Sequence, residues 1–341
     1  MQNSTQIAPT NVFLEKDWLT RILPLELIGD YVKKTDLPAK NSGTVEYGRM
    51  ENIAPVSGSA LPSIKSYVEG VTPNDTSVTY TKIQVPTSLY MNLIRFTEQV
   101  DLLNERGILD EAMKVNSENQ VNLNELILAT ALASGTNVHR YTDSIGGVSG
   151  AARANVVGMM NPDGLNKAVR FMESGSSTTG PVPKFTEGVK ASSGYGTTPI
   201  PGAWLGWCHP DVMTDLRNMP GFTRAEFYAD NLKGEGGIFN GIRWIAHTMC
   251  KVYPDAGAAV AGTKSTTGTL SDVYACTIMG PEAIASVTLK SAGDLIYISH
   301  KNPTQADPGG LQDIIGYKLR TGTGVIDQNR LIRLEVAVSA G

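Results

Sequence analysis

Two extended segments near the N-terminus constrain this chain more than any other feature. Turn residues open the first at 37–44 (LPAKNSGT), and a Gly/Pro break at 69–73 (EGVTP) precedes the second. Proline fixes φ, while Asn, Ser and Gly favour bends. The second segment, 78–94, alternates β-branched or aromatic residues with polar ones, which is the period of a strand. The pattern predicts a long two-stranded arm. Because two strands alone are marginal in water, we expect the arm to rest on a neighbouring copy of the protein.

Composition allows a sizeable core but does not favour tight DNA binding. The chain has 341 residues, of which 41% are hydrophobic, enough for one core or two modest lobes. Its 35 glycines and 18 prolines exceed the roughly 41 that average usage would give, which indicates many turns and extended connections. The 29 basic and 33 acidic residues give a net charge of -4. A protein that grips DNA through its phosphates is usually basic.

The cysteines and the N-terminus indicate where the product resides. Cys208, Cys250 and Cys276 are odd in number, far apart and set among apolar neighbours. They are predicted to be buried free thiols in a reducing cytoplasm. No apolar run approaches the roughly 18 residues of a membrane span, and the N-terminus lacks the basic and apolar regions of a signal peptide. We therefore expect a soluble intracellular product with no membrane partner.

Two helices are predicted in the first half of the chain. Apolar residues fall at roughly helical spacing from 108 to 134, and Gly135 supplies a stop. The polar stretch 116–119 (NSEN) is a poor helix former and favours a kink or break there. A second helix is predicted at 162–174. The Gly/Ser/Thr/Pro-rich stretch 175–202 is either a long surface loop or a flexible insertion.

The second half is predicted to consist mainly of strands. A short buried strand at 203–208 leads into a helix at 209–217, which has Pro at its first position and His209 as a candidate N-cap. A tight turn at 239–241 precedes a strand. The segment 257–269 is predicted to be an exposed loop. Further strands are expected at 273–279, 317–325 and 331–338, the last two completing an earlier sheet.

The sequence predicts no catalytic, cofactor-binding or metal-ligating residue, and so no enzyme. The stretch 257–265 (GAAVAGTKS) misses a phosphate-binding loop because Thr263 separates Lys264 from the preceding glycine. The histidines His139, His209, His247 and His300 have no metal-ligand spacing. Gly-x-Ser-x-Gly does not occur. The tryptophans Trp18, Trp204, Trp207 and Trp244 are interpreted as core.

Several sequence segments, in their order along the chain, resemble one known family. The segments 37–44, 69–73, 78–94 and 108–138, with the phrases around His209 and Phe239, are similar to the major capsid proteins of N-four-type tailed phages. The resemblance runs from about Leu23 to Val338. It implies an α+β chain with the Hong Kong 97 capsid fold. In that family 108–134 is the long spine helix, and 135–138 (GTNV) matches the phrase that closes it.

The resemblance implies a division of the chain. It would comprise an N-terminal arm (1–35), an extended β-hairpin loop (E-loop, 36–95), a peripheral domain (96–200 and returning strands 291–341) and an axial domain (201–290).

The resemblance also implies a structural role in the virion. Many copies would assemble in the bacterial cytoplasm as hexamers and pentamers of an icosahedral shell, which would enclose double-stranded DNA without sequence-specific binding. Scaffolding and portal proteins are implied as partners, and a decoration protein is left open. Two alternatives stay open: an encapsulin-type bacterial nanocompartment and, from another class, a soluble hydrolase with a lidded pocket. Nothing in the sequence supports the Lys–Asn crosslink of some relatives.

Overall fold

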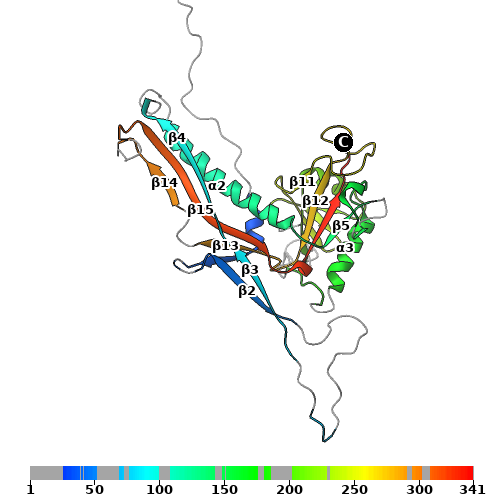
Figure 1. Ribbon diagram of the computed structural model, residues 1–341. Helices are drawn as coiled ribbons and strands as arrows, with labels where there is room; N and C mark the ends of the chain where they lie inside the picture. Colours follow the sequence, from blue (N-terminus) through cyan, green and yellow to red (C-terminus); the bar gives the residue numbers. More distant parts are fainter. Residues whose placement is uncertain are drawn as a thin grey trace, which may run out of the picture.

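The chain forms an elongated part that carries a long helix, a compact lobe beside it, and a strand pair that projects away from both (Figure 1). The computed structural model describes residues 26–38, 40, 42–51, 69–72, 77–99, 108–142, 148–149, 151–175, 180–185, 202–228, 231–289, 294–301 and 308–340. Most of the expected N-terminal arm, much of the expected E-loop between 52 and 76, and most of the stretch 175–202 lie outside these residues.

The elongated part is a five-stranded sheet packed against one long helix. Its strands are β1 (Lys33–Leu37), β13 (Ile284–Leu289), β14 (Asp294–Ile298), β15 (Gln312–Val325) and β4 (Ser88–Thr97). β15 lies in the middle: β13 and β14 pair with successive parts of one edge, and β4 pairs with the other. β1 adds to β13 in parallel. The helix, α2 (Ile108–Leu132), packs against β15.

The predicted kink in the long helix is wrong, because α2 is one continuous helix of 25 residues. Its weak middle is held by the sheet. Asn116 is buried and its Oδ1 accepts a hydrogen bond from Asn92 Nδ2 of β4 at 3.2 Å. Asn119 Oδ1 accepts one from the Tyr317 hydroxyl of β15 at 2.7 Å. These tertiary hydrogen bonds override the low helix propensity of asparagine.

The predicted single strand at 78–94 is two strands with different partners. β3 (Tyr80–Pro86) pairs with β2 (Thr44–Met50) in a separate two-stranded sheet. β4 starts after Thr87 and belongs to the five-stranded sheet. Pro86 has no backbone N–H with which to continue a ladder. The chain changes partners there, so the second half of the predicted arm strand belongs to the elongated part.

The compact lobe is a nine-stranded sheet with helices packed on it. Its order is β6-β5-β16-β12-β7-β10-β9-β8, and β11 pairs with β12. The strands are β5 (Val138–Arg140), β6 (Val148–Ser149), β7 (Trp204–Cys208), β8 (Thr223–Arg224), β9 (Glu235–Phe239), β10 (Ile242–Ala246), β11 (Val252–Tyr253), β12 (Val273–Met279) and β16 (Leu331–Val336). The helices are α3 (Pro162–Ser174) and α4 (Pro210–Arg217), and the short 3-10 turns of the chain are η1 (Ile28–Tyr31), η2 (Arg153–Asn155), η3 (Ala225–Phe227) and η4 (Gln328–Arg330).

The local predictions for this lobe are confirmed. α3 begins after Asn161, whose side chain accepts a hydrogen bond from the Gly164 amide. α4 has proline in its first turn, and His209 Nδ1 accepts from the Asp211 amide at 3.2 Å, which makes His209 the N-cap. The turn between β9 and β10 places Asn240 and Gly241 at φ 45° and 76°. Hydrogen bonds and backbone preferences of residues a few positions apart determine each of these features.

Three of the four tryptophans predicted to be core are buried, and Trp18 lies outside the described residues. Trp204 and Trp244 lie in a cluster with residues of α3 and α4, whereas Trp207 lies in a second cluster with Leu128 and Leu132 of α2. Cys208, Cys250 and Cys276 are buried free thiols, and burial raises the pKa of Cys250 to about 12. Trp207 thus belongs to the layer between the compact lobe and the long helix.

The predicted tail strands are β15 and β16, and they complete two different sheets. The turn η4 joins them and is therefore a crossing point between the elongated part and the compact lobe. In the described part of the chain, none of the helices combines the length and apolar character needed to cross a bilayer.

Candidate interaction surface

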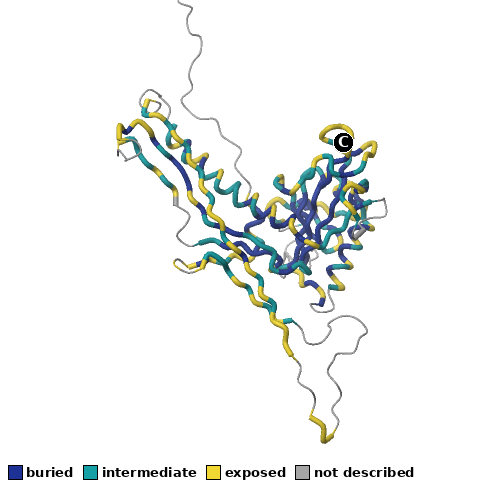
Figure 2. Tube along the Cα trace, viewed as in Figure 1, coloured by how far each residue is buried: buried dark blue, intermediate teal, exposed yellow. Residues whose placement is uncertain are grey.

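The hairpin of β2 and β3 is exposed or half-buried along almost all of its length (Figure 2). Seven residue pairs from Thr44–Pro86 to Met50–Tyr80 form its ladder. Near Thr44 and Pro86 it is anchored to the elongated part, where Val85 packs with Leu37 and Val287. Further out, Met50 is 73% and Tyr80 49% exposed. A two-stranded sheet with exposed apolar side chains and open edges is suited to pairing with another molecule.

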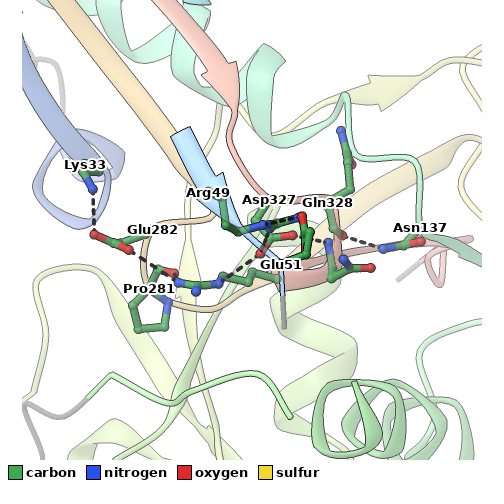
Figure 3. A network of polar contacts seen from close by, with 10 residues as sticks. Lys33, Arg49, Glu51, Asn137, Pro281, Glu282, Asp327 and Gln328 are labelled. Atoms are coloured by element: carbon green, nitrogen blue, oxygen red, sulfur yellow. Dashed lines mark hydrogen bonds and ion pairs between the residues drawn. The ribbon is translucent and has the colours of Figure 1, made fainter. Parts of the chain in front are cut away.

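An ion-pair network fixes the hairpin to the rest of the chain (Figure 3). Arg49 Nη1 lies 2.5 Å from Asp327 Oδ2, and Arg49 Nη2 lies 2.8 Å from Glu51 Oε1. Glu51 also accepts from the Thr81 hydroxyl across the ladder at 2.9 Å. The hydrogen bond from Arg49 lowers the pKa of Glu51 below its usual value, although burial opposes this. The outer end of the ladder, at Arg49 and Glu51, is therefore a defined polar joint.

The same network reaches three other segments through η4 and the turn before β13. Arg330 Nε lies 3.2 Å from Asp327 Oδ2, and its Nη1 donates to the Pro281 carbonyl at 3.0 Å. Glu282 next to Pro281 pairs with Lys33 of β1 at 2.8 Å. The Gln328 side chain accepts from the Thr136 amide just beyond α2 at 2.9 Å. One short turn thus connects the hairpin, the N-terminal strand and the end of the long helix.

A second buried joint ties the N-terminal turn to the long helix and the compact lobe. Glu125 of α2 accepts from the amides of Ile28 and Gly29 at 3.1 and 3.2 Å. His247 Nε2 lies 3.4 Å from the same carboxylate, and its Nδ1 accepts from the Met249 amide, so the proton is on Nε2. Burial raises the pKa of Glu125, but the bonds from His247 and the backbone amides outweigh it and lower the pKa.

An apolar strip runs along β4 on the face away from α2. Leu89, Met91 and Leu93 are 56%, 58% and 40% exposed, at the two-residue spacing of one strand face. Asn92, on the alternate face, contacts α2. Within the described residues β4 pairs only with β15 and is an edge strand. An edge strand with several exposed apolar side chains is a typical association surface.

Several residues weighed from sequence as possible chemical sites contact other parts of the fold, and His139 packs against Phe171. His209 caps α4, His247 bonds Glu125, and Lys264 lies 2.6 Å from Asp211 Oδ2. His300 Nδ1 lies 2.9 Å from the buried Asp313 carboxylate. Across the described ranges, no group of three His, Cys, Asp or Glu residues is placed to hold a metal ion.

Sequence reasoning missed the two polar joints, since their partners are distant in the chain. Lys33 and Glu282, for example, are 249 positions apart. The sequence around each residue carries no sign of its partner, because a charged residue on a predicted surface could pair with any opposite charge.

Comparison with known proteins identifies the architecture. The capsid of Ralstonia phage GP4 matches with a TM-score of 0.66 and 10% identity over 99% of this chain and 98% of that chain. The capsid of cyanophage P-SCSP1u matches with 0.62 and 11% identity over 97% and 94% of the two chains. The head of Helicobacter pylori bacteriophage KHP40 gives 0.60 and 11% over 99% and 97%. No family model and no curated protein matches the sequence significantly.

Each of these structural matches covers nearly the full length of both compared chains. They place the chain in one fold class, the mixed α+β fold of phage capsid proteins, as the Hong Kong 97 resemblance predicted. In this chain the fold consists of the long helix α2, the projecting hairpin and the two sheets (Figure 1).

Proposed function

We propose that this chain is the major capsid protein of a tailed phage, a structural protein with no reaction of its own. Many copies would form hexamers and pentamers of an icosahedral shell around double-stranded DNA, and the mature protein would reside in the virion. The observation that carries the proposal is the full-length likeness to phage capsids, combined with a hairpin whose outer apolar residues Met50 and Tyr80 are exposed.

The described surfaces supply what a shell subunit needs. The hairpin and the β4 strip each present apolar side chains and open strand edges. A specific interface buries about 1,200–2,000 Å². Several such contacts per subunit, arranged around rotation axes, give closed rings. Scaffolding and portal proteins complete the proposed assembly.

Sheet membership supports a division into peripheral and axial parts, with boundaries that run through the sheets. We assign the five-stranded sheet and α2 to the peripheral part. The nine-stranded sheet, with α3 and α4, is assigned to the axial part. The sequence-based boundaries (1–35, 36–95, 96–200, 201–290 and 291–341) differ because α3 falls within 96–200 and β13 within 201–290. Cleavage or protection mapping of the domains tests the two divisions.

The main experiment is electron microscopy and gel filtration of the recombinant full-length protein, with and without a co-expressed scaffolding partner. Shell-like particles or ring assemblies support the proposal. A stable monomer to tetramer that forms no particle under either condition contradicts it and favours the soluble hydrolase. The nucleic-acid content of native particles separates a phage head from an encapsulin-type compartment, which would contain protein cargo.

A further inference from the structure

Three arginines surround one buried carboxylate at the β5 end of the nine-stranded sheet. Glu335 of β16 has no exposed surface. Arg140 Nε lies 2.7 Å from its Oε2, Arg153 Nη2 lies 2.7 Å from Oε1, and Arg333 Nε lies 3.2 Å from Oε1. Arg140, Arg333 and Glu335 come from adjacent strands, where Glu335 is registered with Arg140. The sheet itself therefore gathers the charges on one face.

The cluster carries more positive charge than its carboxylate can balance. Three guanidinium groups and one carboxylate leave a surplus of two positive charges, because arginine stays protonated in proteins. Among the described residues, no second carboxylate lies within ion-pair distance of these arginines. Their side chains are only 19%, 31% and 11% exposed. Arg140 and Arg333 are largely shielded from water, where charges are normally paired, so an anion would be favoured beside them.

The guanidinium groups are fixed in place before any ligand arrives. Arg140 Nη1 donates to the Ala151 carbonyl, and Arg333 Nη1 donates to the Ala133 carbonyl beyond the end of α2. The Arg153 guanidinium is stacked 3.6 Å from the centre of the Tyr253 ring. A preorganised cluster loses little side-chain entropy when it binds.

An open hollow gives an anion access to two of these arginines. It has a volume of about 510 Å³ and is lined by residues 134–138 together with Arg140 and Arg333. The lining from 134 to 138 includes Ser134, Thr136 and Asn137, so the wall is polar as well as cationic. The lining residues place the hollow between the end of α2 and β5.

We propose that this hollow binds a phosphate-class oxyanion through Arg140 and Arg333, whose charges Glu335 leaves partly uncompensated. The planar donors of arginine match phosphate geometry, and two surplus charges match a phosphate better than a single carboxylate. The phosphate has two possible sources: free inorganic phosphate, or the phosphodiester of nucleic acid. The nucleic-acid source rests on the proposed shell function, whereas the free-phosphate source does not.

The test titrates inorganic phosphate into the unassembled full-length protein and follows its thermal unfolding, against chloride at equal ionic strength. A ligand that binds the folded state raises the unfolding temperature in a saturable manner. Arg140→Gln should weaken phosphate binding by about tenfold or more, since a charge-assisted bond is lost. Arg224→Gln is the matched control, because Arg224 is an exposed arginine at the β8 edge of the same sheet. It should leave phosphate binding unchanged.

A second variant guards against misfolding. Arg140→Lys keeps a positive charge beside Glu335 but removes the planar fork, so it should fold and still bind phosphate more weakly than the wild type. Folding of each variant is checked by circular dichroism in chloride alone. The proposal is overturned if phosphate stabilises the wild type no more than chloride does, or if the Arg140 and Arg224 variants respond alike.

A short fluorescent DNA duplex identifies the source. Duplex binding that phosphate competes away, and that falls in Arg140→Gln but not in Arg224→Gln, assigns the site to nucleic-acid phosphodiesters. Phosphate binding without this duplex response assigns it to free phosphate. Both outcomes support the site. Particle formation is scored separately by microscopy, so failure of the shell proposal and failure of the anion site give different results.

Discussion

Arg49 on the hairpin and Asp327 at the crossing between the two sheets form an ion pair with 2.5 Å between Nη1 and Oδ2. The Asp327 side chain is 5% exposed and also contacts Arg330. Because η4 follows Asp327 and joins strands of different sheets, the pair connects the hairpin to the turn at which the two sheets meet. Removing one partner leaves the other charge partly buried.

Asp327→Asn should loosen the hairpin more than the rest of the chain. The loss of the charge facing Arg49 should cost about 1–3 kcal/mol of unfolding free energy, since the pair is only partly desolvated. Hydrogen exchange of the amides of β2 and β3 in the unassembled protein should speed up relative to those of β12. Lys34→Gln is the control, because its pair with Asp30 is 62% exposed on both sides and should change stability by at most about 0.5 kcal/mol. Unchanged exchange in the hairpin would contradict the joint.

Glu125 should make part of the stability depend on pH. Its folded pKa lies below the ordinary value of 4.5. The ionised carboxyl therefore stabilises the fold above that value, and the contribution is lost as the pH falls through the folded pKa. Glu125→Gln should cost about 1–3 kcal/mol at neutral pH. The gap to the wild type should shrink as the pH is lowered below 4.5.

Urea unfolding at several pH values measures this gap. Glu226→Gln, which removes an exposed carboxylate from η3, is the matched variant and should track the wild type. A gap for Glu125→Gln that stays constant into acid would show that the lowered pKa of this carboxyl contributes nothing to stability.

Asn116→Ala should destabilise the protein even though alanine is the better helix former. The gain in helix propensity is at most about 0.7 kcal/mol, whereas losing the buried bond to Asn92 leaves that amide unpaired and costs about 1–3 kcal/mol. Ser117→Ala is the contrasting change, since Ser117 bonds only the nearby Lys114 carbonyl. Ser117→Ala should be neutral or slightly stabilising, because alanine is the better helix former. Chemical denaturation measures both variants, and an Asn116→Ala protein as stable as the wild type would refute the role of Asn116.

Met91→Glu should prevent association without unfolding the subunit. Met91 is 58% exposed on the β4 strip, and a charge placed in an apolar interface must be desolvated when subunits meet. Gel filtration and microscopy should give fewer particles by about tenfold or more, while circular dichroism stays unchanged. Val260→Glu, at a 40% exposed loop position, should assemble normally. Equal particle yields from both variants would remove the β4 strip from the proposed interface.

Features decided by neighbouring residues were predictable from sequence. α3, α4 and the β9–β10 turn follow from caps, proline placement and the Asn240–Gly241 pair, whose backbone preferences act within a few positions. The burial of the tryptophans and cysteines followed from apolar surroundings. The order of extended and helical phrases also pointed to the fold, which the comparison with phage capsids confirms.

Tertiary structure decided the rest, because it depends on partners that are remote along the chain. The polar middle of α2 stays helical only because Asn92 and Tyr317 meet it from the sheet. The strand predicted across 78–94 divides because β15 offers its second half a separate edge. Arg49 pairs with Asp327 only when the hairpin meets the turn between the two sheets, and Glu335 pairs with three arginines only when β5 and β16 lie side by side. Backbone preferences are local and readable in sequence, whereas charge pairing depends on distances that only the packed fold defines.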